Sequence, residues 1–146
     1  MTRSGNPIEV RGLDHVVLRV EDLAASLRFY RDVLGLPIER ELDMGLVQLR
    51  AGAALIDLVP VNSRLGRLGG PPAGANGFNM DHFALELARF DTAAIFAYLD
   101  AHGVAHGGVD QRYGAQGTGP SIYVKDPDGN TVELKGPATD RPRSAV

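Results

Sequence analysis

The chain carries the stretch LDHVVLRV at residues 13–20 and a close copy of it, MDHFALEL, at residues 80–87. Apolar residues stand at the same alternate positions in both copies, and this alternation predicts a half-buried β-strand. His15 and His82 occupy the same position in the two copies. A repeat of this kind predicts a chain built from two modules of the same design.

The match continues into a helix. Residues 27–35 and 95–103 share the order apolar, Tyr, Asp, Gly, and their apolar residues follow helical spacing. Each segment ends at a glycine, which is the residue type favoured directly after a helix. Each half of the chain therefore predicts a strand followed by a helix.

A second pair of strands closes the two halves. Residues 55–58 and 131–134 each follow a turn, and each carries a carboxylate at its third position, Asp57 in one and Glu133 in the other. Each module thus reads as a strand, a helix and a short run of strands, which predicts an α+β fold. Because 60–70 residues bury little core alone, we expect the two modules to pack as one domain.

The predicted single domain spans residues 1–146. Module one covers about 10–65, a glycine-rich linker covers 66–77, module two covers about 78–137, and a flexible tail covers 138–146. A second glycine cluster at 107–119 predicts a loop that covers the functional site of the protein.

Strand alternation assigns the candidate ligands to one face. His15, Asp57, His82 and Glu133 all fall opposite the apolar side chains that a helix would cover. If the two sheets share a concavity on that face, these four residues converge there. Two imidazoles and two carboxylates suit a divalent Ni, Co, Zn, Mn or Fe ion better than Ca or Mg. Each residue alone is more often structural, and it is the matched pairs that favour a metal site.

The composition excludes several classes of protein. There is no cysteine, so disulfides, thiolate metal sites and cysteine nucleophiles are excluded. A net charge of −3 argues against nucleic-acid binding. No apolar run approaches the roughly 20 residues of a membrane span, and the first ten residues lack a signal-peptide pattern. We therefore expect a cytoplasmic protein with no membrane partner.

The sequence resembles the vicinal oxygen chelate superfamily over roughly residues 10–137. The resemblance rests on residues 13–15, 26–36, 80–82 and 122–134. The superfamily includes glyoxalase I, extradiol dioxygenases, methylmalonyl-CoA epimerase, fosfomycin-resistance thiol transferases and bleomycin-binding proteins. The resemblance implies two paired βαβββ modules around a divalent metal ion, a homodimer and a small-molecule substrate.

The resemblance also implies roles for the candidate ligands. His15, His82 and Glu133 match three metal ligands of the glyoxalase and epimerase members. Asp57 stands where those members have Glu or Gln and is one methylene shorter. Two ligand sets therefore stay open, the four residues together or a 2-His-1-carboxylate triad without Asp57.

The leading interpretation is a metal-dependent, glyoxalase-like lyase or isomerase with Glu133 as general base. Arg19 matches an arginine that binds a glutathione carboxylate in glyoxalase I, with an ion pair to Glu86 as the alternative. Val61 replaces an asparagine of that enzyme, so glutathione is not assigned. Tyr123 is a candidate for a substrate hydrogen bond, with packing as the alternative.

Two other functions stay open. One is an extradiol-type dioxygenase that uses the three-ligand triad. The other is a non-catalytic protein that binds an antibiotic or another small molecule.

Overall fold

A computed structural model describes residues 7–8, 13–74 and 80–140. The elements, in chain order, are β1 (His15–Val20), α1 (Leu23–Leu27), the π-helical segment η1 (Arg28–Val33), β2 (Ile38–Leu42), β3 (Leu46–Ala51), β4 (Ala54–Pro60), the 3-10 helix η2 (Gly66–Gly69), β5 (Phe83–Glu86), α2 (Thr92–Ala101), β6 (Asp110–Gly114), β7 (Gly117–Lys125) and β8 (Thr131–Lys135).

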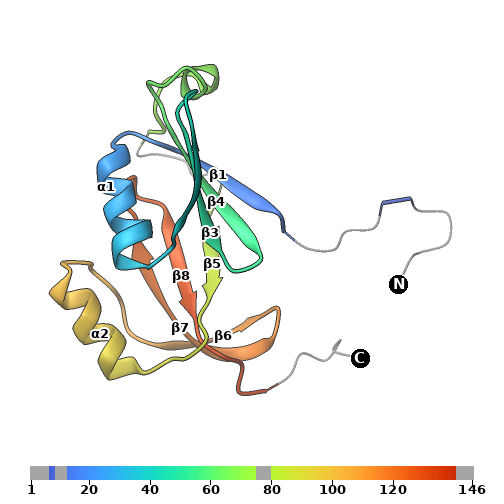
Figure 1. Cartoon of the computed structure of the whole chain (residues 1–146). Helices are drawn as coiled ribbons and strands as arrows, with labels where there is room; N and C mark the ends of the chain where they lie inside the picture. The colour runs from blue at the N-terminus through green and yellow to red at the C-terminus, as the bar shows by residue number, and fades with distance from the viewer. Residues whose placement is uncertain (1–6, 9–12, 75–79, 141–146) are drawn as a thin grey trace.

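The strands form two four-stranded sheets of the same design. The orders are β1-β4-β3-β2 and β5-β8-β7-β6, and the first strand of each module pairs in parallel with the last. The helices α1 and α2 lie on the same side of the two sheets (Figure 1). The predicted α+β fold with two βαβββ modules is therefore confirmed. No helix in the described part of the chain has the length and apolar content that a bilayer crossing requires.

Both helices end at the glycines that the sequence predicts, and an aspartate caps the start of each. Asp22 and Asp91 cap them, and each accepts a hydrogen bond from the backbone N–H three residues on. Gly35 and Gly103 follow them with φ of +81° and +68°, a conformation that glycine adopts without strain. The first helix differs in one respect, because after Leu27 it widens into η1, where the N–H of Leu34 bonds to the carbonyl of Phe29. Periodicity alone does not predict this change.

Strand alternation places the core as expected. In β1, Leu18 and Val20 are buried against the helices, whereas Val17 between them is 53% exposed. In β4 and β8, Ile56, Leu58, Val132 and Leu134 join the same core. The opposite face carries the polar side chains of both modules together with apolar residues such as Val17.

Three segments have features that the sequence does not predict. The segment 107–119 is not a loop, because β6 and β7 form an antiparallel hairpin through it. The linker contains the short helix η2, and its residues 75–77 lie outside the described residues. The start of the tail is held in place, since Thr139 and Asp140 hydrogen-bond to Thr118, while residues 141–146 lie outside the described part.

The two modules are joined by a turn of module two that docks on the first helix. The Tyr30 hydroxyl, fully buried, donates a 2.6 Å hydrogen bond to Asp126. Burial, reinforced by the Asp126 charge, raises the pKa of Tyr30, so the hydroxyl remains a donor. Asp128 of the same turn accepts from the backbone N–H of Glu21. On the other helix, the Tyr98 hydroxyl donates to the carbonyl of Val33.

We predict that Tyr30→Phe lowers the free energy of unfolding by about 1.5–3 kcal/mol, because a buried hydrogen bond to a charged acceptor is lost. Urea denaturation measures this change. Tyr98→Phe is the matched control; its hydroxyl is also bonded, but the residue is 46% exposed, so its expected cost is within about 0.5 kcal/mol. Equal costs for the two variants would contradict the prediction.

Candidate metal and substrate site

The clearest part of the site is a pair formed by His82 and Glu133, here called the second pair. His82 lies directly before β5, and Glu133 is in the adjacent strand β8, 5% exposed. His82 Nε2 lies 3.2 Å from Glu133 Oε1. The other carboxylate oxygen, Oε2, accepts a 2.7 Å hydrogen bond from the Ser121 hydroxyl. Glu133 is thus held in one orientation from both sides.

His15 and Asp57 form the corresponding first pair on β1 and β4. Asp57 is 3% exposed and pairs in register with Val17, two residues after His15. Asp57 Oδ2 accepts a 3.0 Å hydrogen bond from the Gln48 side chain. Its other oxygen, Oδ1, is buried without a hydrogen-bond partner among the described residues. A buried charged oxygen in that state is costly unless a cation or donor satisfies it.

Both histidines are oriented by the residue before them. His15 Nδ1 lies 2.6 Å from Asp14 and His82 Nδ1 lies 2.7 Å from Asp81. The contact with Asp14, together with the charge of Asp57, raises the pKa of His15. When Nδ1–H donates to a carboxylate, Nε2 is left as the ligand atom, an arrangement found around metal-binding histidines. Sequence reasoning missed Asp14 and Asp81, although an aspartate precedes the histidine in both copies of the repeat.

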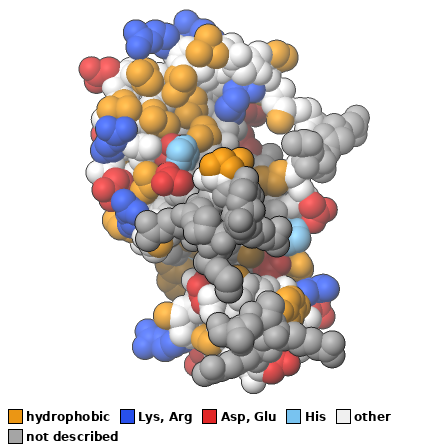
Figure 2. All heavy atoms as spheres, turned by 90° about the vertical axis from the view of Figure 1, so that its right-hand side faces the viewer, with side chains coloured by type: hydrophobic (Ala, Val, Ile, Leu, Met, Phe, Trp, Pro, Cys, Tyr) orange, Lys and Arg blue, Asp and Glu red, His pale blue; other side chains and the backbone are white. Residues whose placement is uncertain are grey.

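The structure brings His82 and Glu133 into contact, whereas His15 and Asp57 lie on neighbouring strands and form no ion pair within 4.0 Å in the described residues. Among residues 7–8, 13–74 and 80–140, no group of three or more His, Asp or Glu side chains is placed to hold one metal ion. On the face shown in Figure 2, histidine side chains reach the surface at two separate places, with acidic side chains beside them. A shared concavity and a four-residue site remain predictions. The donor types themselves fit a divalent ion, and the orphaned oxygen of Asp57 fits a cation.

Arg19 is engaged by the linker. Its guanidinium donates to the carbonyls of Gly66 at 3.1 Å, Pro71 at 3.3 Å and Gly70. The ion pair with Glu86 that the sequence offered as an alternative is not formed within the described residues. Arg19 therefore fastens the start of the linker to β1, and its role in substrate binding remains a prediction.

Tyr123 lies beside the second pair. Its ring meets the His82 ring edge-on, with centroids 5.4 Å apart, and the Arg112 guanidinium lies 5.7 Å from its centre. Desolvation, followed by the Glu133 charge, raises the pKa of the Tyr123 hydroxyl. The hydroxyl is therefore a neutral donor next to Glu133, and a hydrogen bond to substrate remains a prediction.

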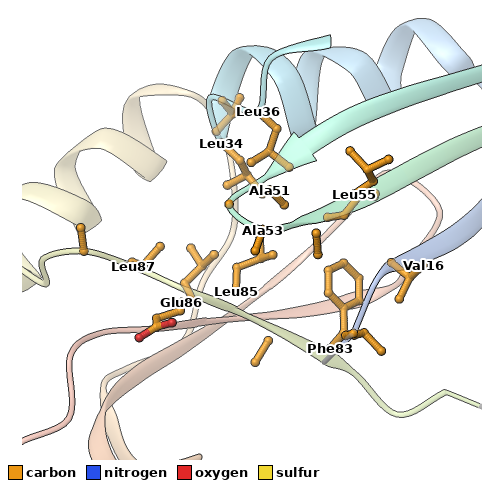
Figure 3. Close-up of a pocket in the computed structure, with 18 of the residues that line it drawn as sticks. Val16, Leu34, Leu36, Ala51, Ala53, Leu55, Phe83, Leu85, Glu86 and Leu87 are labelled. Atoms are coloured by element: carbon orange, nitrogen blue, oxygen red, sulfur yellow. The ribbon is translucent and has the colours of Figure 1, made fainter. Parts of the chain in front are cut away.

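Two cavities border these groups. The larger, about 800 Å³, lies between the modules and is lined mainly by apolar side chains. Figure 3 shows Leu34 and Leu36 after the first helix, and Leu55 of β4, around the same space as Phe83 and Leu85 of β5. His15 is the predicted ligand that borders it. The smaller cavity, about 250 Å³, is lined by His82, Glu133 and the β6–β7 turn, so it is the space that the second pair faces.

We predict that Asp57→Asn raises the free energy of unfolding of the metal-free protein by about 1–2 kcal/mol, because it removes a buried charge that lacks a full set of partners. Thermal or urea unfolding after chelator treatment measures it. Glu133→Gln is the control, since both oxygens of Glu133 already have partners and no gain is expected. A loss of stability in Asp57→Asn would contradict the prediction.

Comparisons with known proteins agree with this fold. Residues 12–134 match the family model described as the Glyoxalase/Bleomycin resistance protein/Dioxygenase superfamily. The chain is 29% identical over 133 residues to a catechol-2,3-dioxygenase of Bacillus subtilis, covering 90% of this chain but 42% of that protein.

It is also 27% identical over 128 residues to virulence protein STM3117 of Salmonella typhimurium, with 84% and 81% of the two chains covered. The crystal structure of that protein superposes with a TM-score of 0.70, at 25% identity and over 90% and 100% of the two chains. A lactoylglutathione lyase structure from Agrobacterium tumefaciens superposes with a TM-score of 0.61 at 22% identity, over 90% and 96%, a likeness of fold. With two βαβββ modules and a family match over most of its length, the chain belongs to the glyoxalase/bleomycin resistance/dioxygenase superfamily.

Proposed function

We propose that the protein is a metal-dependent lyase or isomerase of the glyoxalase type, acting on a small substrate with vicinal oxygens. One observation carries the proposal. His82 Nε2 and Glu133 Oε1 lie 3.2 Å apart, while Nδ1 of the same ring is held by Asp81. A ring nitrogen and a carboxylate oxygen at this distance share either a proton or a metal ion, and two adjacent ligands about 2.1 Å from one ion stand about 3 Å apart, so the pair fits a metal ion.

The ion in this proposal is a divalent Ni, Co, Zn, Mn or Fe, held by His15, His82, Glu133 and Asp57. When bound, it supplies Lewis-acid polarisation of a substrate carbonyl and so acidifies the adjacent C–H. The unpartnered Oδ1 of Asp57 supports the four-ligand set over the triad.

Glu133 is the proposed general base. In this scheme Glu133 would loosen from the ion, and its freed Oε1 would accept the proton from the acidified carbon and return a proton to the neighbouring carbon, which balances an isomerisation. The Ser121 hydroxyl holds Oε2 at 2.7 Å, so the carboxylate keeps its direction while Oε1 gains and loses the proton. Tyr123 supports a substrate oxygen in this scheme, because burial and the nearby carboxylate keep its hydroxyl protonated.

An extradiol-type dioxygenase is the second candidate. The observation that favours it is the 29% identity to the Bacillus catechol-2,3-dioxygenase. This chain spans 42% of that protein's length, so the activity of the whole protein carries over only as a proposal. In this scheme His15, His82 and Glu133 form the triad and Asp57 is not a ligand.

We predict that protein purified without chelator contains a divalent metal and converts methylglyoxal hemithioacetals, formed with glutathione or another small thiol, but not catechol. Metal analysis, product assay and oxygen uptake measure the three results. Glu133→Gln is expected to lower kcat about 10²–10⁴-fold. Glu41→Gln, an exposed carboxylate on β2, is the control and leaves kcat unchanged. Oxygen uptake with catechol, without hemithioacetal conversion, would favour the second candidate instead.

We also propose that a second copy of the chain completes the metal site. The support is that, within the described residues, no three of the proposed ligands meet at one point. In a two-fold dimer, the first pair of one copy and the second pair of the other form two equivalent sites.

We predict that His15→Ala and His82→Ala each lose metal alone, whereas mixing them after partial unfolding and refolding restores it. Random pairing makes about half of the dimers mixed, and each mixed dimer has one intact site and one site that lacks both histidines. Roughly a quarter of all sites therefore recover. Metal content per chain and light scattering measure the result. His15→Ala refolded alone is the control. Full dimerisation without recovery in the mixture would show that each site forms within one chain.

A further inference from the structure

Lys135 is a buried lysine at the end of β8. It is 8% exposed, and within the described residues it takes part in no side-chain hydrogen bond and in no ion pair. Lysine is almost never buried unless it is paired, because removing its charge from water is costly. The structure therefore contains a cation without a counter-charge in contact with it.

The place of Lys135 links it to the second pair. It follows Glu133 by two residues, so its side chain shares a sheet face with that carboxylate. Both residues line the smaller cavity, about 250 Å³, together with His82. This cavity holds a predicted base, a predicted metal ligand and an unpaired cation side by side.

A glycine makes room for the lysine. A Cβ atom at Gly114, at the end of β6 and two strands away in the same sheet, would meet Lys135 Cε at 3.0 Å, Cδ at 3.2 Å and Nζ at 3.7 Å. The aliphatic stem thus passes directly over Gly114, which lines the same cavity. A side chain at 114 would require the stem to shift by a few tenths of an ångström, so glycine leaves the space that the stem occupies.

The neighbouring carboxylates do not neutralise Lys135. Glu86 is its register partner on β5 and lines the same cavity, but the two form no ion pair within 4.0 Å in the described part of the chain. Glu133 is engaged by His82 and Ser121. Module one carries Val59, 2% exposed, where module two has Lys135, so the repeat does not duplicate this lysine.

We propose that Lys135 is a specificity-determining residue that binds the anionic oxygens of a substrate carboxylate or phosphate. This inference rests on the proposed function and narrows its substrate class. The substrate would carry vicinal oxygens at one end and an anionic group at the other. A charge-assisted hydrogen bond forms when the anion enters the cavity. Neutral substrates of the same size lack this contact.

The test uses two matched probes on the Ni²⁺-loaded protein. Butanohydroxamate offers vicinal oxygens and a terminal methyl group, and N-hydroxysuccinamate replaces that methyl with a carboxylate. Calorimetric titration is expected to show about 10- to 100-fold tighter binding of the carboxylate probe, as a hydrogen bond between charged groups provides. Lys135→Met should reduce the preference to about twofold and leave butanohydroxamate affinity unchanged, whereas Lys135→Arg should retain most of the preference.

Titration of the metal-free protein with inorganic phosphate separates this inference from the proposed function. Phosphate binding that is lost in Lys135→Met supports the anion site, even if neither hydroxamate binds and the metal proposal fails. Phosphate affinity that is equal in wild type and Lys135→Met, or a carboxylate preference that survives in Lys135→Met, overturns the inference. Lys135→Met is expected to fold, because an apolar side chain of similar length replaces an unpaired buried charge; thermal unfolding checks this.

Discussion

The parallel pairing of the first and last strand of each module is the constraint on which the site depends. It aligns Val17 with Asp57 in one sheet and Ala84 with Glu133 in the other. Since side chains alternate along a strand, this register sends the apolar residues toward the helices and leaves each histidine beside a carboxylate. A shift of one residue in either pairing would exchange the two faces. The same strand register therefore determines both the packing of the core and the position of the ligands.

The two modules share this plan but differ where chemistry and packing need it. Module two contributes the turn at Asp126 that receives Tyr30, and module one has only the short turn at Gly52 in that place. The carboxylate of module two has both oxygens satisfied, whereas Asp57 of module one keeps one oxygen orphaned. The duplicated strands therefore carry carboxylates with different hydrogen-bond partners.

Much of this structure follows from sequence because its signals are local. The alternation around His15 and His82, and the glycines after both helices, are properties of short segments. The π-helical turn was not predictable from periodicity. The hairpin was not predictable either, because the glycine content of 107–119 favours a loop, whereas the pairing of residues 110–114 with 117–121 makes both segments strands. The ligand types were readable from the repeat, but their distances depend on how the modules pack, and no periodicity encodes that.

The anchoring of the tail has a consequence for how relatives diverge. Asp140 reaches back to β7, and a Cβ atom at Gly117 would meet its carbonyl oxygen at 1.9 Å. Gly117 begins β7, next to the turn that walls the smaller cavity, yet Asp140 lies beyond the stretch 12–134 that the family shares. Substitutions in the chain after β8 can reshape this wall without changing any motif that the family shares. Two relatives with the same motifs can therefore prefer different ligands.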